Sequence, residues 1–138
     1  MITKQTIFLV VDDFETMRDI IAKHVRSLGA VSSNVLKAGN GAEALAILKQ
    51  KQVHCVLSDW NMPVMTGIEL LKAVRSDDKL CHLPFIMITA EAKYKQIEEA
   101  AYSGVSDLLI KPYTLEQLEE RINRALMSKN RAVIRSRV

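Results

Sequence analysis

The sequence contains no long hydrophobic segment. Its longest uninterrupted apolar run is IFLVV, at 7–11, whereas a membrane-spanning helix needs about 20 apolar residues. The first residues also lack the basic-then-apolar pattern of a secretory signal. We therefore expect a cytoplasmic protein that does not insert into a membrane.

Cysteine and histidine are scarce and show no metal-ligand spacing. Cys55 and Cys81 are far apart, and neither belongs to a C-x-x-C pair or to a zinc-finger pattern. We expect both to be reduced thiols of the core. His24, His54 and His82 form no triad pattern either, so we expect them to be structural or to face solvent.

The chain also has no basic excess once its C-terminus is set aside. The net charge is +3, but the last stretch, SKNRAVIRSRV, carries four basic residues and no acid. The rest of the chain has 15 basic residues against 16 acidic ones, a net charge of −1. Because a nucleic-acid-binding face requires a basic patch, we expect no direct nucleic acid binding by this domain.

Apolar runs rich in β-branched residues alternate with longer segments of helical period along the chain. The expected strands are 7–11, 35–38, 55–58, 85–89 and 108–110. The expected helices are 14–28, 42–51, a third after position 66, 93–103 and a last one after position 114. Strands joined by crossover helices are parallel, and strands apolar along their whole length are buried on both faces. The pattern predicts an α/β fold with a doubly wound five-stranded parallel sheet and helices on both faces.

The helices carry further local signals. Thr66 with Glu69, and Thr114 with Gln117, have the spacing of a capping box. The period of three and four residues predicts an inward-facing stripe on the first and last helices. The residues of these two stripes are Met17, Ile20, Ile21, Val25 and Leu28, and Leu115, Leu118, Ile122, Ala125 and Leu126.

Polar residues follow the strands, where ligands bind in a doubly wound sheet. They are Asp12, Asp13, Asp59, Thr89 and Lys111. Three carboxylates brought together repel one another and need a cation, and hard oxygen ligands at a phosphate site favour Mg²⁺. Taken singly, Asp13 is also a plausible helix cap and Lys111 a plausible surface lysine. Their joint placement at one sheet edge instead predicts a magnesium site.

Asp59 is the predicted acceptor of a phosphoryl group at this site. A carboxylate can attack phosphorus to give an aspartyl phosphate, and the transfer needs positive charge around the equatorial oxygens. Mg²⁺, the ammonium of Lys111 and the hydroxyl of Thr89 would supply that stabilisation.

Four segments, VVDDFETMR, SDWNMPVMTGIELLKAVR, MITAEAK and LLIKPYTLEQLEE, carry these residues. They closely resemble, in the same order, the receiver domains of two-component response regulators, and CheY-like chemotaxis receivers most of all. The resemblance covers about 7–127, and it implies the flavodoxin-like form of the doubly wound sheet. It implies a receiver domain at 1–127, a phosphoprotein of two-component signal transduction, followed by a basic tail or the start of a linker at 128–138.

The resemblance also implies roles for individual residues. Asp12, Asp13, Asp59 and the backbone carbonyl of Asn61 would hold Mg²⁺, with Asp13 the more direct ligand. Asp59 would receive phosphate from a histidine kinase. The residues implied for phosphoryl binding and switching are Thr89, Ala90 and Lys111, and those implied for modulating dephosphorylation are the side chains of Asn61 and Glu91.

An output face on the fourth helix, fifth strand and fifth helix is implied as well. Its expected residues are Ile97, Tyr102, Leu108, Arg121 and Arg124. This face would meet a downstream protein partner, and a phosphatase would be a further partner. Leu108 stands where the family usually has an aromatic residue, which predicts that output is transmitted differently. Thr66 stands where an Asp is usual, and it can cap the helix equally well.

Alternative functions remain open from sequence. The chain could be the receiver part of a longer multidomain response regulator whose output domain is missing from this chain. An aspartyl-phosphate phosphatase of the haloacid dehalogenase type usually has a second acid two residues after the nucleophile, where this chain has Asn61. A flavin or dinucleotide carrier would need a G-x-G-x-x-G motif after Val11, and none is present. We therefore expect no enzyme activity beyond promotion of its own phosphorylation and autodephosphorylation.

Overall fold

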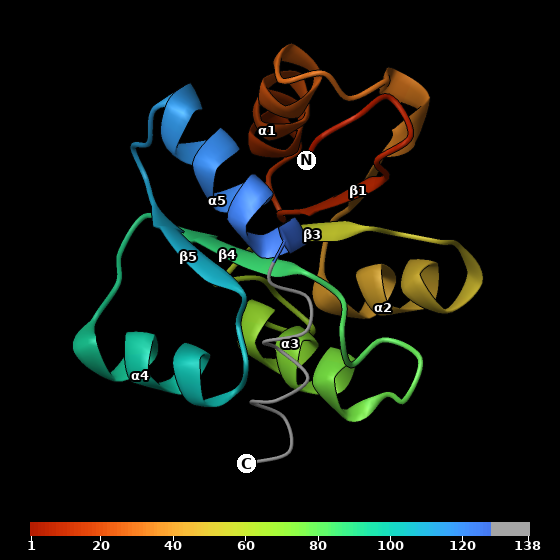
Figure 1. Cartoon of the computed structure of the whole chain (residues 1–138). Helices are drawn as coiled ribbons and strands as arrows, with labels where there is room; N and C mark the ends of the chain where they lie inside the picture. The colour runs from red at the N-terminus through yellow and green to blue at the C-terminus, as the bar shows by residue number, and fades with distance from the viewer. Residues whose placement is uncertain (128–138) are drawn as a thin grey trace.

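The structure, a computed structural model, describes residues 1–127, in which strands and helices alternate (Figure 1). The strands are β1 (Phe8–Val11), β2 (Val35–Ala38), β3 (Cys55–Asp59), β4 (Phe85–Thr89) and β5 (Asp107–Ile110). The helices are α1 (Glu15–Ser27), α2 (Gly41–Gln50), α3 (Gly67–Ser76), α4 (Tyr94–Tyr102), α5 (Leu115–Met127) and the short 3₁₀ helix η1 (Ser32–Asn34). The predicted tail or linker at 128–138 lies outside the described residues.

The five strands form one parallel sheet in the order β2-β1-β3-β4-β5. The chain passes from β1 outward to β2, returns to β3, and then continues outward in the opposite direction. This reversal makes the boundary between β1 and β3 the topological switch point, where ligands bind in such sheets. The predicted doubly wound, flavodoxin-like fold is confirmed.

Alternate side chains of each strand enter one of two apolar layers, as the two-residue period of a strand requires. Phe8 and Val10 pack with α1 and α5, whereas Leu9 and Val11 pack with α2, α3 and α4. Figure 1 shows α1 and α5 together on one face of the sheet and the other three helices on the opposite face. Burying a single Leu or Ile side chain contributes about 1.5–3 kcal/mol, so both layers contribute to stability.

Both predicted capping boxes are present. The Thr66 hydroxyl accepts from the backbone N–H of Glu69 at 3.3 Å, and the backbone N–H of Thr66 donates to the Glu69 carboxylate at 2.9 Å. Thr114 and Gln117 make the equivalent pair of bonds at 3.1 and 2.9 Å. These bonds fix where α3 and α5 begin, directly after the loops that carry the candidate site.

Three expectations about burial were wrong. Ile20 is 40% exposed, because the buried stripe of α1 is centred on the adjacent Ile21. Leu115 is also 40% exposed, since it lies one turn before the buried Leu118 and the stripe of α5 meets the core only from its second turn. Cys81 lies half-buried in the loop between α3 and β4 rather than in the core, whereas Cys55 is fully buried in β3.

The histidines are structural or exposed, as predicted. His54 accepts a hydrogen bond from the backbone N–H of Ile7 at its Nδ1, over 2.9 Å, and His82 is exposed. His24 contacts the Tyr113 hydroxyl. No helix within residues 1–127 is long and apolar enough to cross a membrane.

Candidate functional site

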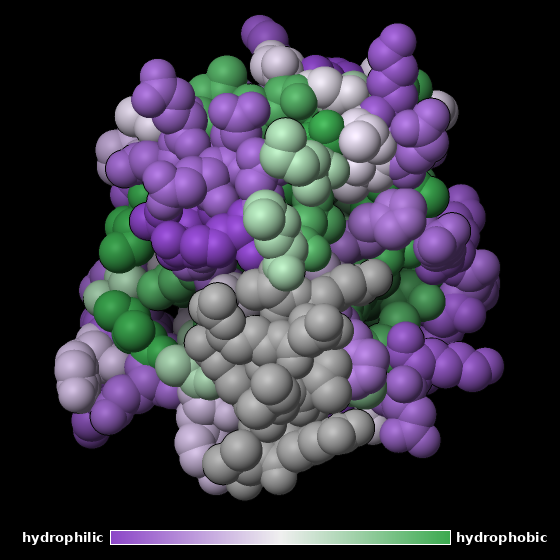
Figure 2. Space-filling view, in the orientation of Figure 1, coloured by the Kyte–Doolittle hydropathy of each residue, from purple (hydrophilic) through white to green (hydrophobic). Residues whose placement is uncertain are grey.

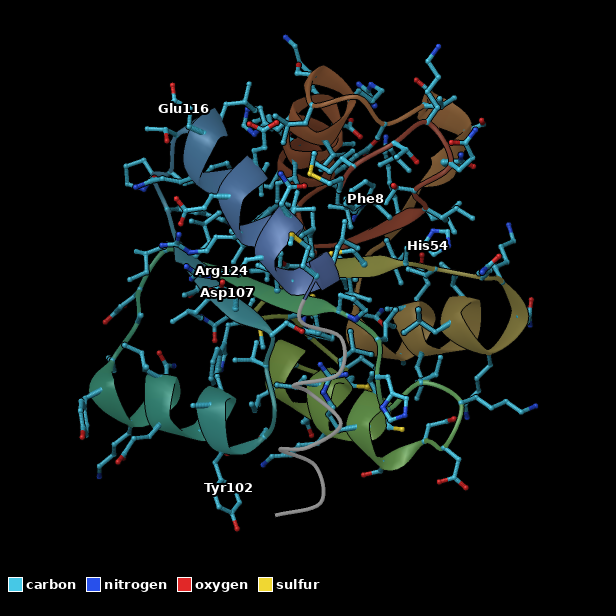
Figure 3. The ribbon with its side chains drawn as sticks, viewed as in Figure 1. Phe8, His54, Tyr102, Asp107, Glu116 and Arg124 are labelled. Atoms are coloured by element: carbon cyan, nitrogen blue, oxygen red, sulfur yellow. The ribbon has the colours of Figure 1, made fainter. Side chains whose placement is uncertain are left out.

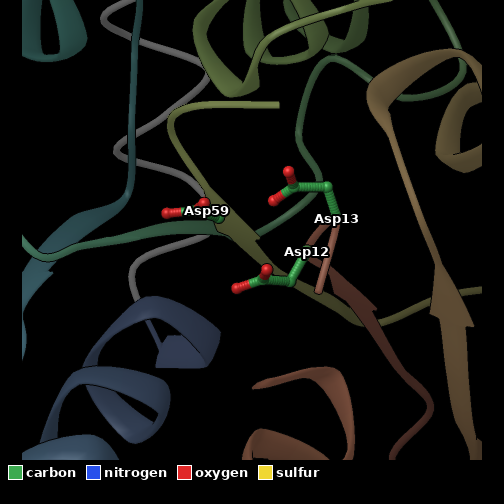
Figure 4. Close-up of side chains that lie close together, drawn as sticks. All are labelled: Asp12, Asp13 and Asp59. Carbon is green, nitrogen blue, oxygen red and sulfur yellow. The ribbon is translucent and has the colours of Figure 1, made fainter. Parts of the chain in front are cut away.

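Three carboxylates meet at the carboxyl edge of the sheet, at the switch point between β1 and β3. One oxygen from each of Asp12, Asp13 and Asp59 lies within 4.8 Å of the others, and Figure 4 shows the three side chains close together. The cause is the sheet register, in which Val11 pairs with Ser58, so the residues that follow them are brought together. The predicted acidic cluster is therefore present.

Asp12 is the fully buried member of the cluster. Its Oδ1 accepts a hydrogen bond from the backbone N–H of Phe14 at 3.0 Å, which turns the chain into α1. Its Oδ2 is buried and has no hydrogen-bond donor. A buried anionic oxygen without a donor is costly, and a hard cation is the partner that carboxylate oxygens prefer. The residues present thus fit a divalent metal ion.

Asp59 has a perturbed acidity. Desolvation and the negative charge of Asp12 raise the pKa of Asp59 to about 6, while Lys111 and the backbone N–H of Trp60 oppose the rise. A smaller contribution to the rise in pKa comes from Asp13. Such a carboxylate is only partly solvated and is held near other anions, so a cation that favours its charged form prepares it to act as a nucleophile.

Lys111 reaches into the cluster from the end of β5. Its ammonium nitrogen lies 3.6 Å from Asp12 Oδ2 and 4.0 Å from Asp59 Oδ1, and its side chain is 19% exposed. The backbone N–H of Lys111 donates to the carbonyl of Thr89 at 2.8 Å. The lysine is thus held between two of the acids, where it can neutralise part of their charge.

Thr89 lies at the end of β4 and is almost fully buried. Its hydroxyl donates to the carbonyl of Glu91 at 3.0 Å and accepts from the Glu91 backbone N–H at 3.3 Å. The hydroxyl therefore holds the first turn of the loop between β4 and α4. Ala90 and Glu91 are exposed in this loop, and the Glu91 carboxylate lies 3.8 Å from the Lys93 ammonium.

The loop after β3 is held close to the cluster. Asn61 is exposed there, next to the buried Trp60. The backbone N–H of Gly67 donates to the Trp60 carbonyl at 2.8 Å, and a Cβ at Gly67 would collide with the Asp59 carbonyl. Only glycine lets α3 begin this close to the end of β3. The sequence pattern had not singled out Gly67, although its place directly after the N-cap Thr66 was visible.

The predicted output residues lie on α4, β5 and α5. Tyr102 is 95% exposed and Ile97 is 40% exposed, whereas Leu108 is partly buried against the core. Figure 3 shows Tyr102 projecting from the end of α4. In Figure 2, hydrophilic side chains cover much of α5, and hydrophobic surface lies between α4 and α5 at the left of the view.

The two arginines of this face are paired within the chain. Arg124 contacts Asp107 Oδ2 at 2.9 Å, and Arg121 Nε lies 3.4 Å from Asp107 Oδ1. Figure 3 shows Arg124 and Asp107 side by side. Sequence reasoning missed Asp107, because nothing in a periodic pattern indicates which acid on β5 will meet two arginines on α5.

The sequence of the chain matches known proteins over most of its length. The family model described as the response regulator receiver domain matches residues 8–123. The chain is 49% identical over 116 residues to the chemotaxis protein CheY of Pseudomonas aeruginosa, covering 84% of this chain and 92% of the relative. It is 46% identical over 124 residues to the chemotaxis protein CheY-3 of Vibrio cholerae, covering 90% and 94%.

Solved structures agree with the fold. The chemotaxis response regulator CheY4 of Vibrio cholerae superposes with a TM-score of 0.78 at 32% identity, covering 87% of this chain and 98% of that one. The receiver domain of a sensor histidine kinase of Pseudomonas aeruginosa superposes with a TM-score of 0.79 at 25% identity, covering 89% and 98%. That second structure has a magnesium ion coordinated in its active site cleft.

Proposed function

The chain belongs to the response regulator receiver domain family, and we propose that Asp59 is its phosphorylation site and Mg²⁺ its metal ion. As a CheY-like member, the chain is a phospho-accepting receiver, and its place in two-component signalling makes a histidine kinase its phosphate source. It is not an enzyme with a separate substrate. The observation that supports the site most strongly is the buried Asp12 oxygen without a donor, beside two further carboxylates.

The proposed metal ligands are oxygens of Asp12, Asp13 and Asp59 and the backbone carbonyl of Asn61. When bound, Mg²⁺ would supply positive charge to the phosphoryl oxygens. Asp12 holds its carboxylate fixed through the Phe14 backbone N–H. Asp13 is exposed, so its carboxylate is the one of the three that reaches an ion from the solvent side.

Phosphoryl transfer in this proposal uses the chain's own groups. An oxygen of the Asp59 carboxylate attacks phosphorus, the O–P bond forms as the P–N bond of the donor phosphohistidine breaks, and the imidazole leaves with a proton from solvent. The Lys111 ammonium, 4.0 Å from Asp59 Oδ1, neutralises charge on the equatorial oxygens. Ala90 directly follows Thr89 and takes part in phosphoryl binding at the end of β4. The side chains of Asn61 and Glu91, which are exposed beside the site, modulate hydrolysis of the aspartyl phosphate.

Thr89 supplies the step that leads from phosphorylation to a change of shape. Its hydroxyl is bonded to the backbone of Glu91, and a phosphoryl group on Asp59 would compete for it. Withdrawal of the hydroxyl frees the loop that leads into α4. Leu108 stands where the family usually has an aromatic residue, and it packs on the core, so it cannot act as a ring that moves with Thr89. The signal therefore passes through this loop to the output face. The residues of that face are Ile97, Tyr102, Leu108, Arg121 and Arg124.

The names of the relatives, both chemotaxis proteins, favour a chemotaxis-like role with a downstream protein partner.

The emission of Trp60 tests the function directly. Trp60 is 6% exposed and directly follows Asp59 in the chain, so its ring should report events at the site. We expect a saturable change with Mg²⁺ and a second change on adding a small acyl phosphate. In Asp59→Asn the second change should be absent. If the emission of the wild-type protein changes neither with Mg²⁺ nor with the acyl phosphate, the proposal is wrong.

A further inference from the structure

A contact outside the acidic cluster ties α1 to the loop that carries Lys111. The Tyr113 hydroxyl and His24 Nδ1 lie 2.7 Å apart. The two rings also meet edge to face, with centroids 5.5 Å apart and planes at 85°. A hydrogen bond and a ring contact between the same two side chains restrict both position and orientation.

The hydroxyl of Tyr113 keeps its proton in this contact. Burial raises the pKa of Tyr113 to about 12, and the ring packs against the apolar layer formed with α1 and α5. A neutral phenol can donate to an unprotonated imidazole nitrogen or accept from a protonated one. The contact is therefore maintained whichever tautomer His24 adopts.

The contact anchors one residue of the segment between Lys111 and α5. Lys111 is held at its backbone by the Thr89 carbonyl, and α5 begins at the Thr114 cap. Pro112, which lies between them, has no backbone N–H to donate. The side chain of Tyr113 joins this stretch to α1, the helix that starts directly after Asp12 and Asp13.

We propose that the His24–Tyr113 contact is a positioning device for Lys111. By fixing the loop after β5 to α1, it holds the ammonium at its place between Asp12 and Asp59. Displacements of about 1 Å at a reacting group can lower a rate by up to about a hundredfold. The His24–Tyr113 contact, two residues from Lys111, can therefore affect the rate of phosphoryl transfer without touching the phosphate. This inference rests on the proposed phosphorylation of Asp59.

The test measures the rate constant of phosphorylation by acetyl phosphate at saturating Mg²⁺. Tyr113→Phe keeps the ring and removes the hydroxyl, and we expect its rate to fall about three- to tenfold, as a partial displacement predicts. Titration of Trp60 emission with Mg²⁺ establishes for each variant that the metal site is intact and saturated, so that the rates are compared at the same metal occupancy. His24→Leu should lower the rate similarly, and the double variant should be no slower than either single one.

The decisive arm repeats Tyr113→Phe in a Lys111→Ala background. If the contact acts through Lys111, the tyrosine substitution has no further effect on the residual rate there. The matched control is Tyr94→Phe, since Tyr94 is 76% exposed at the start of α4. We expect that control to phosphorylate at the wild-type rate.

The outcomes separate the two proposals. If wild type takes up phosphate and Tyr113→Phe does so equally fast, the positioning role is wrong and the proposed function stands. A further loss of rate in the Lys111→Ala background, equal to that in wild type, would also show that the contact does not act through Lys111. If wild type takes up no phosphate, the proposed function fails and the positioning role fails with it.

Discussion

The ammonium of Lys111 lies 3.6 Å from the buried oxygen of Asp12 that has no hydrogen-bond donor. The distance exceeds that of a hydrogen bond, so the lysine offsets the charge of the oxygen without satisfying it. Because one lysine faces three carboxylates, the cluster is negative when all three are ionised. This imbalance is the physical reason to expect affinity for a divalent cation.

Magnesium should stabilise the fold. At a free concentration of 100 times its dissociation constant, a ligand that binds only the folded state adds about 2.7 kcal/mol to the free energy of unfolding. We expect this gain for wild type and its loss in Asp13→Asn, because Asp13 reaches the ion from solvent. Urea unfolding with and without Mg²⁺ measures both values, and an equal gain in the variant would exclude Asp13 as a ligand.

In metal-free protein, Asp59→Asn should be more stable than wild type at about pH 7.5, by about 1–3 kcal/mol. The raised pKa of Asp59, about 6 against an ordinary 3.8, means that its ionisation destabilises the fold above that pH. The advantage of Asn should therefore shrink as the pH falls from about 6 and vanish below about 3, where the carboxyl is protonated in both states. Urea unfolding of both proteins in EDTA across this range checks the sign, and an advantage that is constant with pH would contradict it.

Gly67→Ala should destabilise the protein by about 1–3 kcal/mol, as overpacking does. The new Cβ would strike the backbone carbonyl of Asp59, which cannot move without shifting the end of β3. Gly39→Ala is the matched control, because its Cβ would lie 3.3 Å from the flexible guanidinium of Arg18. Thermal unfolding should show the larger loss at Gly67, and equal losses would mean that the loop after β3 adapts freely.

Two arginines should differ sharply in their effect on stability. The guanidinium of Arg75 donates to the carbonyls of Gly104 at 2.8 Å and Leu83 at 2.7 Å, and burial lowers the pKa of Arg75 to about 10. Arg75→Ala leaves those carbonyls without their donor, and we expect a loss of about 3 kcal/mol or more. Arg124→Ala removes an ion pair whose arginine side chain is 55% exposed, and it should cost under about 1 kcal/mol. Chemical denaturation measures both, and similar losses would contradict this reading of the contacts.

The strands and the acidic cluster could be predicted from sequence because their determinants are local. Fully apolar runs indicate buried parallel strands, and parallel strands bring their carboxyl ends to one edge. Asp12 and Asp59 then meet because β1 and β3 are neighbours in the sheet. The capping boxes at Thr66 and Thr114 are equally local. These parts of the prediction needed no knowledge of which helix packs where.

The remaining features depend on tertiary contacts that periodicity does not encode. The pattern could not show that Tyr113 would reach His24, because the two residues are distant in sequence and no spacing rule links them. For the same reason it missed that Asp107 pairs with Arg124. Leu115 was misplaced because a helical stripe indicates a face, and it does not show at which turn that face meets the sheet.

Mapping the phosphate tests the central claim most directly. The protein is treated with acetyl phosphate and Mg²⁺, the acyl phosphate is trapped by borohydride reduction, and the modified residue is located by peptide mass spectrometry. We predict one phosphoryl group per chain, located at Asp59, dependent on Mg²⁺ and absent from Asp59→Asn. Phosphate on a different residue, or the same yield after Mg²⁺ is removed with EDTA, would contradict the account.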